Sequence, residues 1–272
     1  MTSKDKHAEH TAMNRKAWDA YQPDYMEFHL KAHPDFFEHL GGGGVYLDDD
    51  EVRLAGEVTG LTVLDVCCSS AADEAFSWEN LGANVIACDL SPVAIDIAKE
   101  NAARLKSRIQ FVVADAQELA PIASDSVDLV YGRYLCWFED LEQTMQTWFR
   151  VTKPGGRLLI SEGHPLTGCL RVEGETYRLV WKYHDESPEY GDFEGTPLAD
   201  HCSGWRGPRH PSVEFFHPTW RIVNAILAAG FQLLRMEEPT RLPGSERRCA
   251  DLPHDLLILA RKPGAEARPR SR

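Results

Sequence analysis

Short apolar runs alternate with amphipathic stretches between residues 61 and 161. The runs are five or six residues long, which suits buried strands, and the stretches between them place apolar residues at helical spacing. This alternation is typical of a parallel sheet with helices on both faces, so it predicts an α/β fold. The predicted strands are 61–66, 84–88, 109–113, 127–131 and 157–161, and the predicted helices are 71–81, 92–104, a short one at 116–119, and 140–151.

The pattern changes on either side of this core. The first forty residues predict short helical pieces, and the acidic start of 48–58 favours a helix there, because acids stabilise the positive end of a helix dipole. Periodicity is lost over 164–214 apart from one hairpin that turns at Glu173-Gly174, and a loop region of this length usually carries a binding function. The chain returns to a helix at 217–230 and then to two strands, expected as an antiparallel pair at the sheet edge.

These patterns divide the chain into five segments with different expected roles. They are an N-terminal helical cover (1–47), a cofactor-binding α/β core (48–163), a loop-rich substrate-pocket insertion (164–216), a helix and strands that complete the core (217–262), and a disordered tail (263–272).

Composition narrows the range of partners. The 272 residues carry a net charge of -13, which repels nucleic acid and anionic membrane surfaces, so a small-molecule substrate is expected. Seven cysteines, an odd number without a CxxC pair, indicate a reducing compartment rather than a disulfide framework. No apolar run reaches the ~20 residues of a membrane span and the N-terminus has no signal-peptide core, which together predict a cytoplasmic protein.

Candidate ligand-binding residues stand where the predicted strands end. Open α/β sheets bind ligands outside the carboxyl ends of their strands. Asp89 follows the second strand, where a carboxylate can accept both hydroxyls of a ribose, although it can also merely end that strand before Ser91 and Pro92 start a helix. Asp115 follows the third strand and suits an adenine amino group, or alternatively the N-cap of the short helix at 116.

The turn after the first strand, in VLDVCCSSAADEA (63–75), has the position of a nucleotide-binding turn but contains no glycine. A Cβ obstructs close backbone approach and disfavours positive φ. All the replacements are small, and Ser70 to Asp73 matches a capping box that would start the next helix.

Four strings together resemble the class I S-adenosylmethionine-dependent methyltransferases over residues 48–163. They are VLDVCCSSAADEA, ANVIACDLSPVAIDIAKENA, IQFVVADAQEL and DLVYGRYLCWFEDLEQTMQTWFRVTKPGGRLLISE, and FFHPTWRIVNAILAAGFQLLRMEEP is similar to the substrate-pocket helix and strand of small-molecule members. The resemblance implies a doubly wound, mostly parallel seven-stranded sheet, the Rossmann-like fold of that family, with S-adenosyl-L-methionine as cofactor.

The resemblance also implies a place for each part of that cofactor. Its ribose would bind Asp89, its adenine would lie between Leu90 and Asp115-Ala116, Tyr131 would lie near the methyl group, and Tyr21 belongs to the cover. The family turn is D-x-G-x-G-x-G, and we still expect binding here, because only a small carboxylate and ammonium must fit, with no pyrophosphate. The residues expected around the amino-acid tail are Asp65, Cys67, Cys68, Ser69, Ala71 and Asp73.

The methyl acceptor is expected beside the fourth and fifth strands. His164 follows the fifth strand and is the candidate general base, with an oriented loop histidine as the alternative. Arg133, Tyr134 and Trp137 would form an aromatic acceptor pocket, and His217 would face the same space.

Two classes of function follow from these assignments. The first is methyl transfer to an oxygen or nitrogen of a small metabolite, with a specialised natural product as the expected substrate. The alternative is a non-catalytic binding module whose altered turn no longer holds cofactor. A nicotinamide dehydrogenase is excluded because it needs G-x-G-x-x-G, and a zinc site from His201, Cys202, His210 and His217 is disfavoured because it lacks ligand spacing, so no metal is expected.

Overall fold

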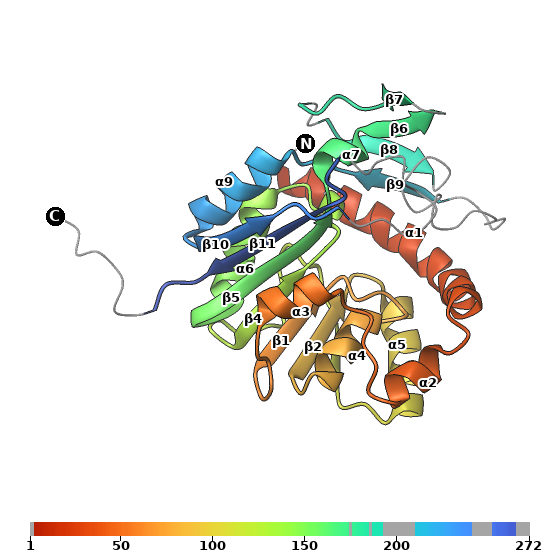
Figure 1. Ribbon diagram of the computed structural model, residues 1–272. Helices are drawn as coiled ribbons and strands as arrows, with labels where there is room; N and C mark the ends of the chain where they lie inside the picture. Colours follow the sequence, from red (N-terminus) through yellow and green to blue (C-terminus); the bar gives the residue numbers. More distant parts are fainter. Residues whose placement is uncertain (1–2, 174–175, 185–186, 193–209, 241–251, 265–272) are drawn as a thin grey trace.

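A seven-stranded sheet forms the centre of the computed structural model (Figure 1). The structure describes residues 3–173, 176–184, 187–192, 210–240 and 252–264. The strand order β10-β11-β5-β4-β1-β2-β3 confirms the predicted fold class. The strands are β1 (Thr62–Val66), β2 (Asn84–Asp89), β3 (Gln110–Val113), β4 (Val127–Gly132), β5 (Thr152–Gly163), β10 (Gln232–Glu237) and β11 (Asp255–Arg261).

The first five strands of this sheet run parallel and reverse their order next to β1. β1 pairs with β2 on one side and with β4 on the other, so successive connections leave in opposite directions there. Such a reversal opens a crevice at the carboxyl ends of the strands. β11 is antiparallel to both β5 and β10, which confirms the expected final pair, with β10 at the edge.

Alternate side chains of the central strands pack into two separate apolar cores, one on each face of the sheet. In β1, for example, Val63 packs into one core and Leu64 into the other, as the period of two requires. Both cores exclude water, which explains why the parallel strands read as continuous apolar runs. The helices on the first face are α2 (Phe36–Gly41), α3 (Asp49–Ala55), α4 (Asp73–Asn80) and α5 (Pro92–Leu105), and those on the second are α6 (Leu141–Val151) and α9 (Thr219–Ala229).

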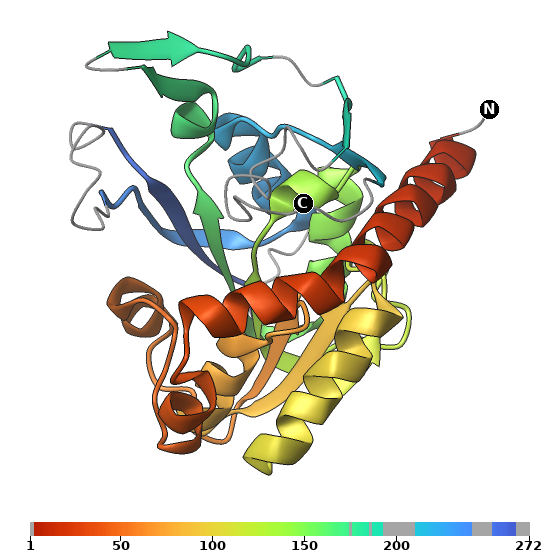
Figure 2. The ribbon, with the colours of Figure 1, turned by 90° about the vertical axis from the view of Figure 1, so that its right-hand side faces the viewer.

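A single long helix, α1 (Ser3–Ala32), replaces the short helical pieces expected at the N-terminus, even though it contains Pro23. It contacts α5 of the core and β9 of the insertion, so tertiary contacts stabilise it along its length. Figures 1 and 2 show it running between the core and the small sheets above it. The remaining elements are η1 (Leu135–Trp137), α7 (Pro165–Gly168), β6 (Leu170–Glu173), β7 (Thr176–Leu179), β8 (Glu189–Asp192) and β9 (Pro211–Glu214).

Two local predictions were wrong. No helix forms at 116–119, because the backbone turns through Leu119, whose φ is 45°, and the Glu118 and Leu119 amides both donate to the Asp115 carbonyl. Helix α4 begins without a capping box: its N-cap is Ala72, with left-handed backbone and no side-chain cap.

Parts of other predictions fall outside the described residues, namely Gly174 of the expected hairpin turn and residues 265–272 of the expected disordered tail. Within the described chain, no helix combines the length and the apolar character needed to cross a membrane.

Gly132, at the end of β4, tests the packing of the second core. A Cβ at this position would overlap the indole ring of Trp148, whereas one at Gly163, at the end of β5, would meet no atom within 4 Å. We therefore expect Gly132→Ala to lower the free energy of unfolding by about 1–3 kcal/mol, as overpacking does, and Gly163→Ala to change it little. Denaturant unfolding of both variants measures the difference, and equal stabilities would contradict the described packing.

Candidate functional site

A cavity of about 1150 Å³ lies at the carboxyl ends of the strands, between the core, α1 and the β8–β9 sheet. Its volume exceeds the several hundred Å³ typical of a site for one small molecule. Most of the residues predicted from the sequence line it, and these are Cys67, Ser69, Asp73, Asp89, Leu90, Asp115, Ala116, Arg133, Tyr134, Trp137, His164 and His217.

The turn between β1 and α4 adopts the conformation that glycine favours, without any glycine. Cys67 and Ser69 have φ values of 60° and 58°, and Ala72 has a φ of 50°. Cys67 and Ser69 stand at two of the family's glycine positions. At the third glycine position, Ala71 does not have a positive φ, but the next residue, Ala72, does. Left-handed backbone costs an ordinary residue roughly 1–2 kcal/mol, so other contacts must hold the turn.

Hydrogen bonds from three distant elements hold this turn. The Ser69 amide donates to Asp89 Oδ2 at 2.9 Å, at the end of β2. Gln22 of α1 reaches in with its side-chain carbonyl and accepts from the Ser70 amide at 3.0 Å and from Ser69 Oγ at 3.1 Å. Asn101 of α5 donates to the Ser70 carbonyl at 3.0 Å. The backbone polar groups of the turn are therefore satisfied by the surrounding fold.

The position of Asp89 is compatible with both of the roles that the sequence left open. Its Oδ1 accepts the Ser91 amide at 2.8 Å, and Ser91 caps α5 by accepting the Ala94 amide. The carboxylate is only 9% exposed and also lines the cavity. Burial raises the pKa of Asp89 to about 6, so it is mostly ionised at neutral pH. Each oxygen uses one lone pair in the fold and keeps another, so the group can still accept two hydroxyls.

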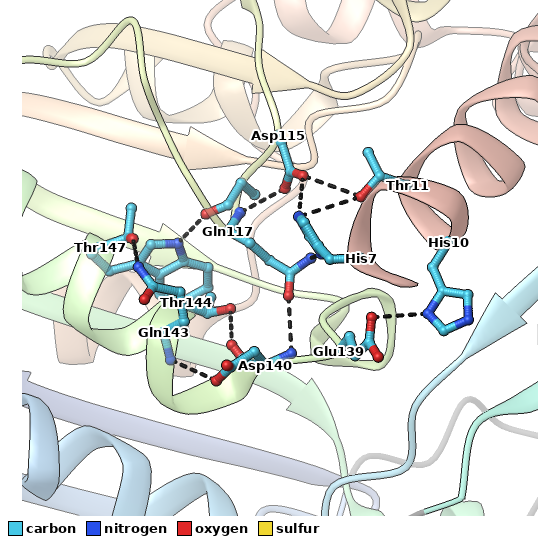
Figure 3. Close-up of polar contacts among 12 residues, drawn as sticks. His7, His10, Thr11, Asp115, Gln117, Glu139, Asp140, Gln143, Thr144 and Thr147 are labelled. Carbon is cyan, nitrogen blue, oxygen red and sulfur yellow. Dashed lines mark hydrogen bonds and ion pairs between the residues drawn. The ribbon is translucent and has the colours of Figure 1, made fainter. Parts of the chain in front are cut away.

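Asp115 is already paired with the N-terminal turns of α1 (Figure 3). Its Oδ2 accepts from His7 Nε2 at 3.1 Å and from Thr11 Oγ1 at 3.3 Å, and its Oδ1 accepts the Gln117 amide at 2.8 Å. The Gln117 side-chain amide lies 3.2 Å from His7 Nδ1, which fixes the ring orientation. The hydrogen bond to Asp115 raises the pKa of His7. Helix α1 therefore closes this end of the cavity by a polar contact.

Arg133 lines the cavity among buried and half-buried carboxylates. Its guanidinium forms an ion pair with Glu74 of α4. Burial raises the pKa values of Glu51 and Glu162, and the charge of Arg133 partly offsets that rise. One cation is therefore shared among several acids in this part of the cavity wall.

His164 occupies the alternative role of an oriented loop histidine. Its Nδ1 accepts the Leu166 amide at 3.2 Å as the N-cap of α7, and its Nε2 lies 2.9 Å from Glu238 Oε1, to which it must donate. Both ring nitrogens are thus used by the fold, because the Nδ1 lone pair accepts from the Leu166 amide and Nε2 donates to Glu238. The prediction of His164 as general base does not fit this geometry.

Five predicted site residues do not line the cavity, and for each the cause is burial in the core. Tyr131 donates to Glu51 Oε1 at 2.7 Å and packs edge-on against Trp78. Tyr21 packs against Trp18, and Tyr25, one helical turn further along α1, lines the cavity instead. The five are Asp65, Cys68, Ala71, Tyr131 and Tyr21.

Sequence reasoning missed three lining residues that matter here: Gln22, Glu162 and Glu214. Gln22 gives no pattern signal, because its partners lie some fifty residues away. Glu162 directly follows the apolar residues of β5, as Asp89 follows those of β2. Glu214 stands between Val213 and Phe215, and an acid inside an apolar run was the available signal.

No cluster of three or more His, Cys, Asp or Glu side chains in the described ranges is arranged to hold a metal ion. His201 and Cys202 of the disfavoured zinc site lie outside those ranges.

Comparison with known proteins agrees with the geometry. Residues 64–160 match a family model described as a methyltransferase domain. This part of the chain is therefore similar to methyltransferase domains. The expected resemblance to S-adenosylmethionine-dependent methyltransferases is thereby confirmed.

The similar proteins differ in what they are named for. The chain is 31% identical over 182 residues to malonyl-[acyl-carrier protein] O-methyltransferase of Yersinia pestis, an alignment that covers 65% of this chain and 61% of the relative. The chain is also 30% identical over 121 residues to phosphoethanolamine N-methyltransferase of Triticum aestivum, an alignment that covers 44% of this chain and 24% of the relative. The chain thus spans less than two thirds of either curated relative.

A solved structure shows the same fold. It is an S-adenosylmethionine dependent methyltransferase from Mesorhizobium loti, with a TM-score of 0.60 and 23% identity over 78% of this chain and 95% of that one.

The contact between His7 and Asp115 should be visible in the titration of His7. Because the hydrogen bond raises the pKa of His7, the contact stabilises the docked helix fully below the ordinary pKa of about 6.5 and is lost as the pH rises through the raised value. The charges facing His7 are Asp115, Glu118 and Glu139. We expect Asp115→Asn to lower the pKa of His7, followed by nuclear magnetic resonance of the ring, and the exposed control Asp96→Asn to leave it unchanged. An unaltered His7 titration in Asp115→Asn would contradict the contact.

Proposed function

We propose that this chain binds S-adenosyl-L-methionine in the cavity and transfers a methyl group to a nitrogen or oxygen of a small organic molecule held beside it. When bound, the cofactor would supply a methyl group on a positively charged sulfur. The observation that carries the proposal is the buried Asp89 carboxylate, tied to the Ser69 amide across a left-handed turn at the edge of the cavity.

The residues of the cavity fit the parts of such a cofactor. Asp89 retains two lone pairs for a ribose diol, and Leu90 and Ala116 offer apolar surface beside Asp115 for a purine ring. Asp73 lies on the wall beside the turn, where a carboxylate suits an ammonium group. Purine binding at Asp115 would use the second lone pair of Oδ1, because Oδ2 is engaged by α1.

The rest of the cavity provides the space for an acceptor and keeps water out. Trp18 of α1 packs edge-on against Trp137 at a centroid separation of 5.2 Å, so α1 and η1 together cover the cavity. Tyr134 and Trp137 supply aromatic faces, which suit a flat organic molecule. In methyl transfer the protein mainly aligns the nucleophile and excludes water, and these residues can do both. A specialised natural product remains the expected acceptor.

Cofactor binding tests the proposal without knowledge of the acceptor. Isothermal titration with S-adenosylhomocysteine should show binding, and Asp89→Asn should weaken it about tenfold or more, because one charged acceptor of the diol is lost. Asp96→Asn, an exposed change on α5, serves as the matched control and should bind as the unaltered chain does.

Absence of binding by the unaltered chain at millimolar ligand would contradict the proposal and favour the non-catalytic binding module. Once binding is established, metabolite extracts incubated with methyl-labelled S-adenosylmethionine would identify the acceptor.

A further inference from the structure

Glu214, the last residue of β9, is held in the cavity wall by its two neighbours. The Val213 amide donates to Asn14 Oδ1 at 2.8 Å, and Asn14 Nδ2 donates back to the Val213 carbonyl at 2.9 Å. The Phe215 amide donates to the Cys136 carbonyl at 2.7 Å. Helix α1 and η1 therefore fix the backbone on both sides of Glu214, although the residue belongs to the insertion.

The Glu214 carboxyl group is buried without a complete set of partners. The side chain is 5% exposed and lines the cavity, and its Oε1 accepts no hydrogen bond from the described residues. Burial, with a contribution from the charge of Glu189, raises its pKa to about 7. A buried carboxylate that lacks hydrogen bonds is costly, and nothing in the described packing offsets that cost. A ligand that donates a hydrogen bond to Oε1 would offset it.

His217 presents a second acceptor in the same wall. Its Nε2 donates to the Phe138 carbonyl at 2.8 Å, which leaves Nδ1 as the lone-pair nitrogen. That Nδ1 is buried and has no hydrogen-bond partner in the described structure. Burial lowers the pKa of His217 to about 4, so the ring is neutral at physiological pH. The two atoms without a partner in the described structure, Glu214 Oε1 and His217 Nδ1, are therefore both hydrogen-bond acceptors.

Cys136 connects Glu214 with the side of the cavity where the cofactor is proposed to bind. Burial raises the pKa of its thiol, and the charges of Glu214 and Glu162 and the thiol of Cys67 contribute further. These groups are thus close enough to Cys136 to influence it. Cys67 belongs to the turn after β1, and Cys67, Cys136 and Glu214 all line the cavity.

We propose that Glu214 binds the amino group of the methyl acceptor, with Nδ1 of His217 as a second hydrogen-bond acceptor. The substrate class is a primary or secondary amine, because in its ammonium form the nitrogen carries two or more hydrogens and can donate to both atoms, whereas a hydroxyl has one hydrogen. This inference rests on the proposed function and narrows its acceptor.

The proton balance of this step involves only Glu214 and the acceptor. An amine binds in its ammonium form to the ionised carboxylate. One N–H bond then breaks, the proton moves to a carboxylate oxygen of Glu214, and the electron pair stays on nitrogen as the lone pair needed for attack. Glu214 ends as a neutral carboxylic acid and the substrate as a neutral amine.

A pair of probes that differ in one functional group tests the inference. We would titrate benzylamine and benzyl alcohol into the unaltered chain, Glu214→Gln and the exposed control Glu100→Gln, with S-adenosylhomocysteine titrated into each. The unaltered chain should prefer benzylamine, and Glu214→Gln should weaken benzylamine binding about tenfold or more, since a charged hydrogen bond is lost. Benzyl alcohol and S-adenosylhomocysteine should bind Glu214→Gln nearly as before.

Three results would overturn the inference: a preference for benzyl alcohol, an equal loss of both probes in Glu214→Gln, or no benzylamine binding at millimolar concentration. A ¹³C titration of the glutamate carboxyl groups gives a second readout. Benzylamine should shift the Glu214 signal, and an unmoved signal would also overturn the inference. If the unaltered chain binds benzylamine but does not bind S-adenosylhomocysteine, the proposed function is rejected and the amine site is not.

Discussion

The left-handed turn between β1 and α4 is the constraint on which the site depends. Because the turn has no glycine, each left-handed position destabilises it by roughly 1–2 kcal/mol, and each hydrogen bond contributes a net stabilisation of about 1 kcal/mol. Asp89 and Gln22 supply such bonds to Ser69 and Ser70. The turn therefore keeps its shape only while β2 and α1 are in place, and cofactor-site geometry is coupled to docking of the N-terminal helix.

Helix α1 is consequently a structural part of the cavity as well as its cover. Three positions along it bind three different regions: His7 binds the end of β3, Asn14 binds β9, and Gln22 binds the first turn. The cavity that it closes is rich in carboxylates, and Arg133 is shared among several of them. A cavity lined by carboxylates and aromatic rings is consistent with the proposed small-molecule substrate.

The sequence predicted what depends on local pattern. Apolar runs located the strands, and the rule that ligands bind at strand ends identified Asp89 and Asp115. Prediction from the sequence failed where contacts between residues far apart in the chain determine the structure. Helix α1 is continuous because β9 and α5 stabilise it, and Ala72 replaces Ser70 as the cap because Ser70 binds Gln22. Tyr131 points into the core, and the hydrogen bonds of His164 become visible only when Glu238 and α7 are placed beside it.

The most direct test of the central claim is a crystal structure of the chain with S-adenosylhomocysteine. The account predicts that Cys67 and Ser69 keep positive φ, that the contacts of Ser69 with Asp89 and of Ser70 with Gln22 persist, and that both ribose hydroxyls donate to Asp89. A ligand bound elsewhere, or a turn that abandons its left-handed conformation and fills the site with the Cys67 side chain, would contradict it.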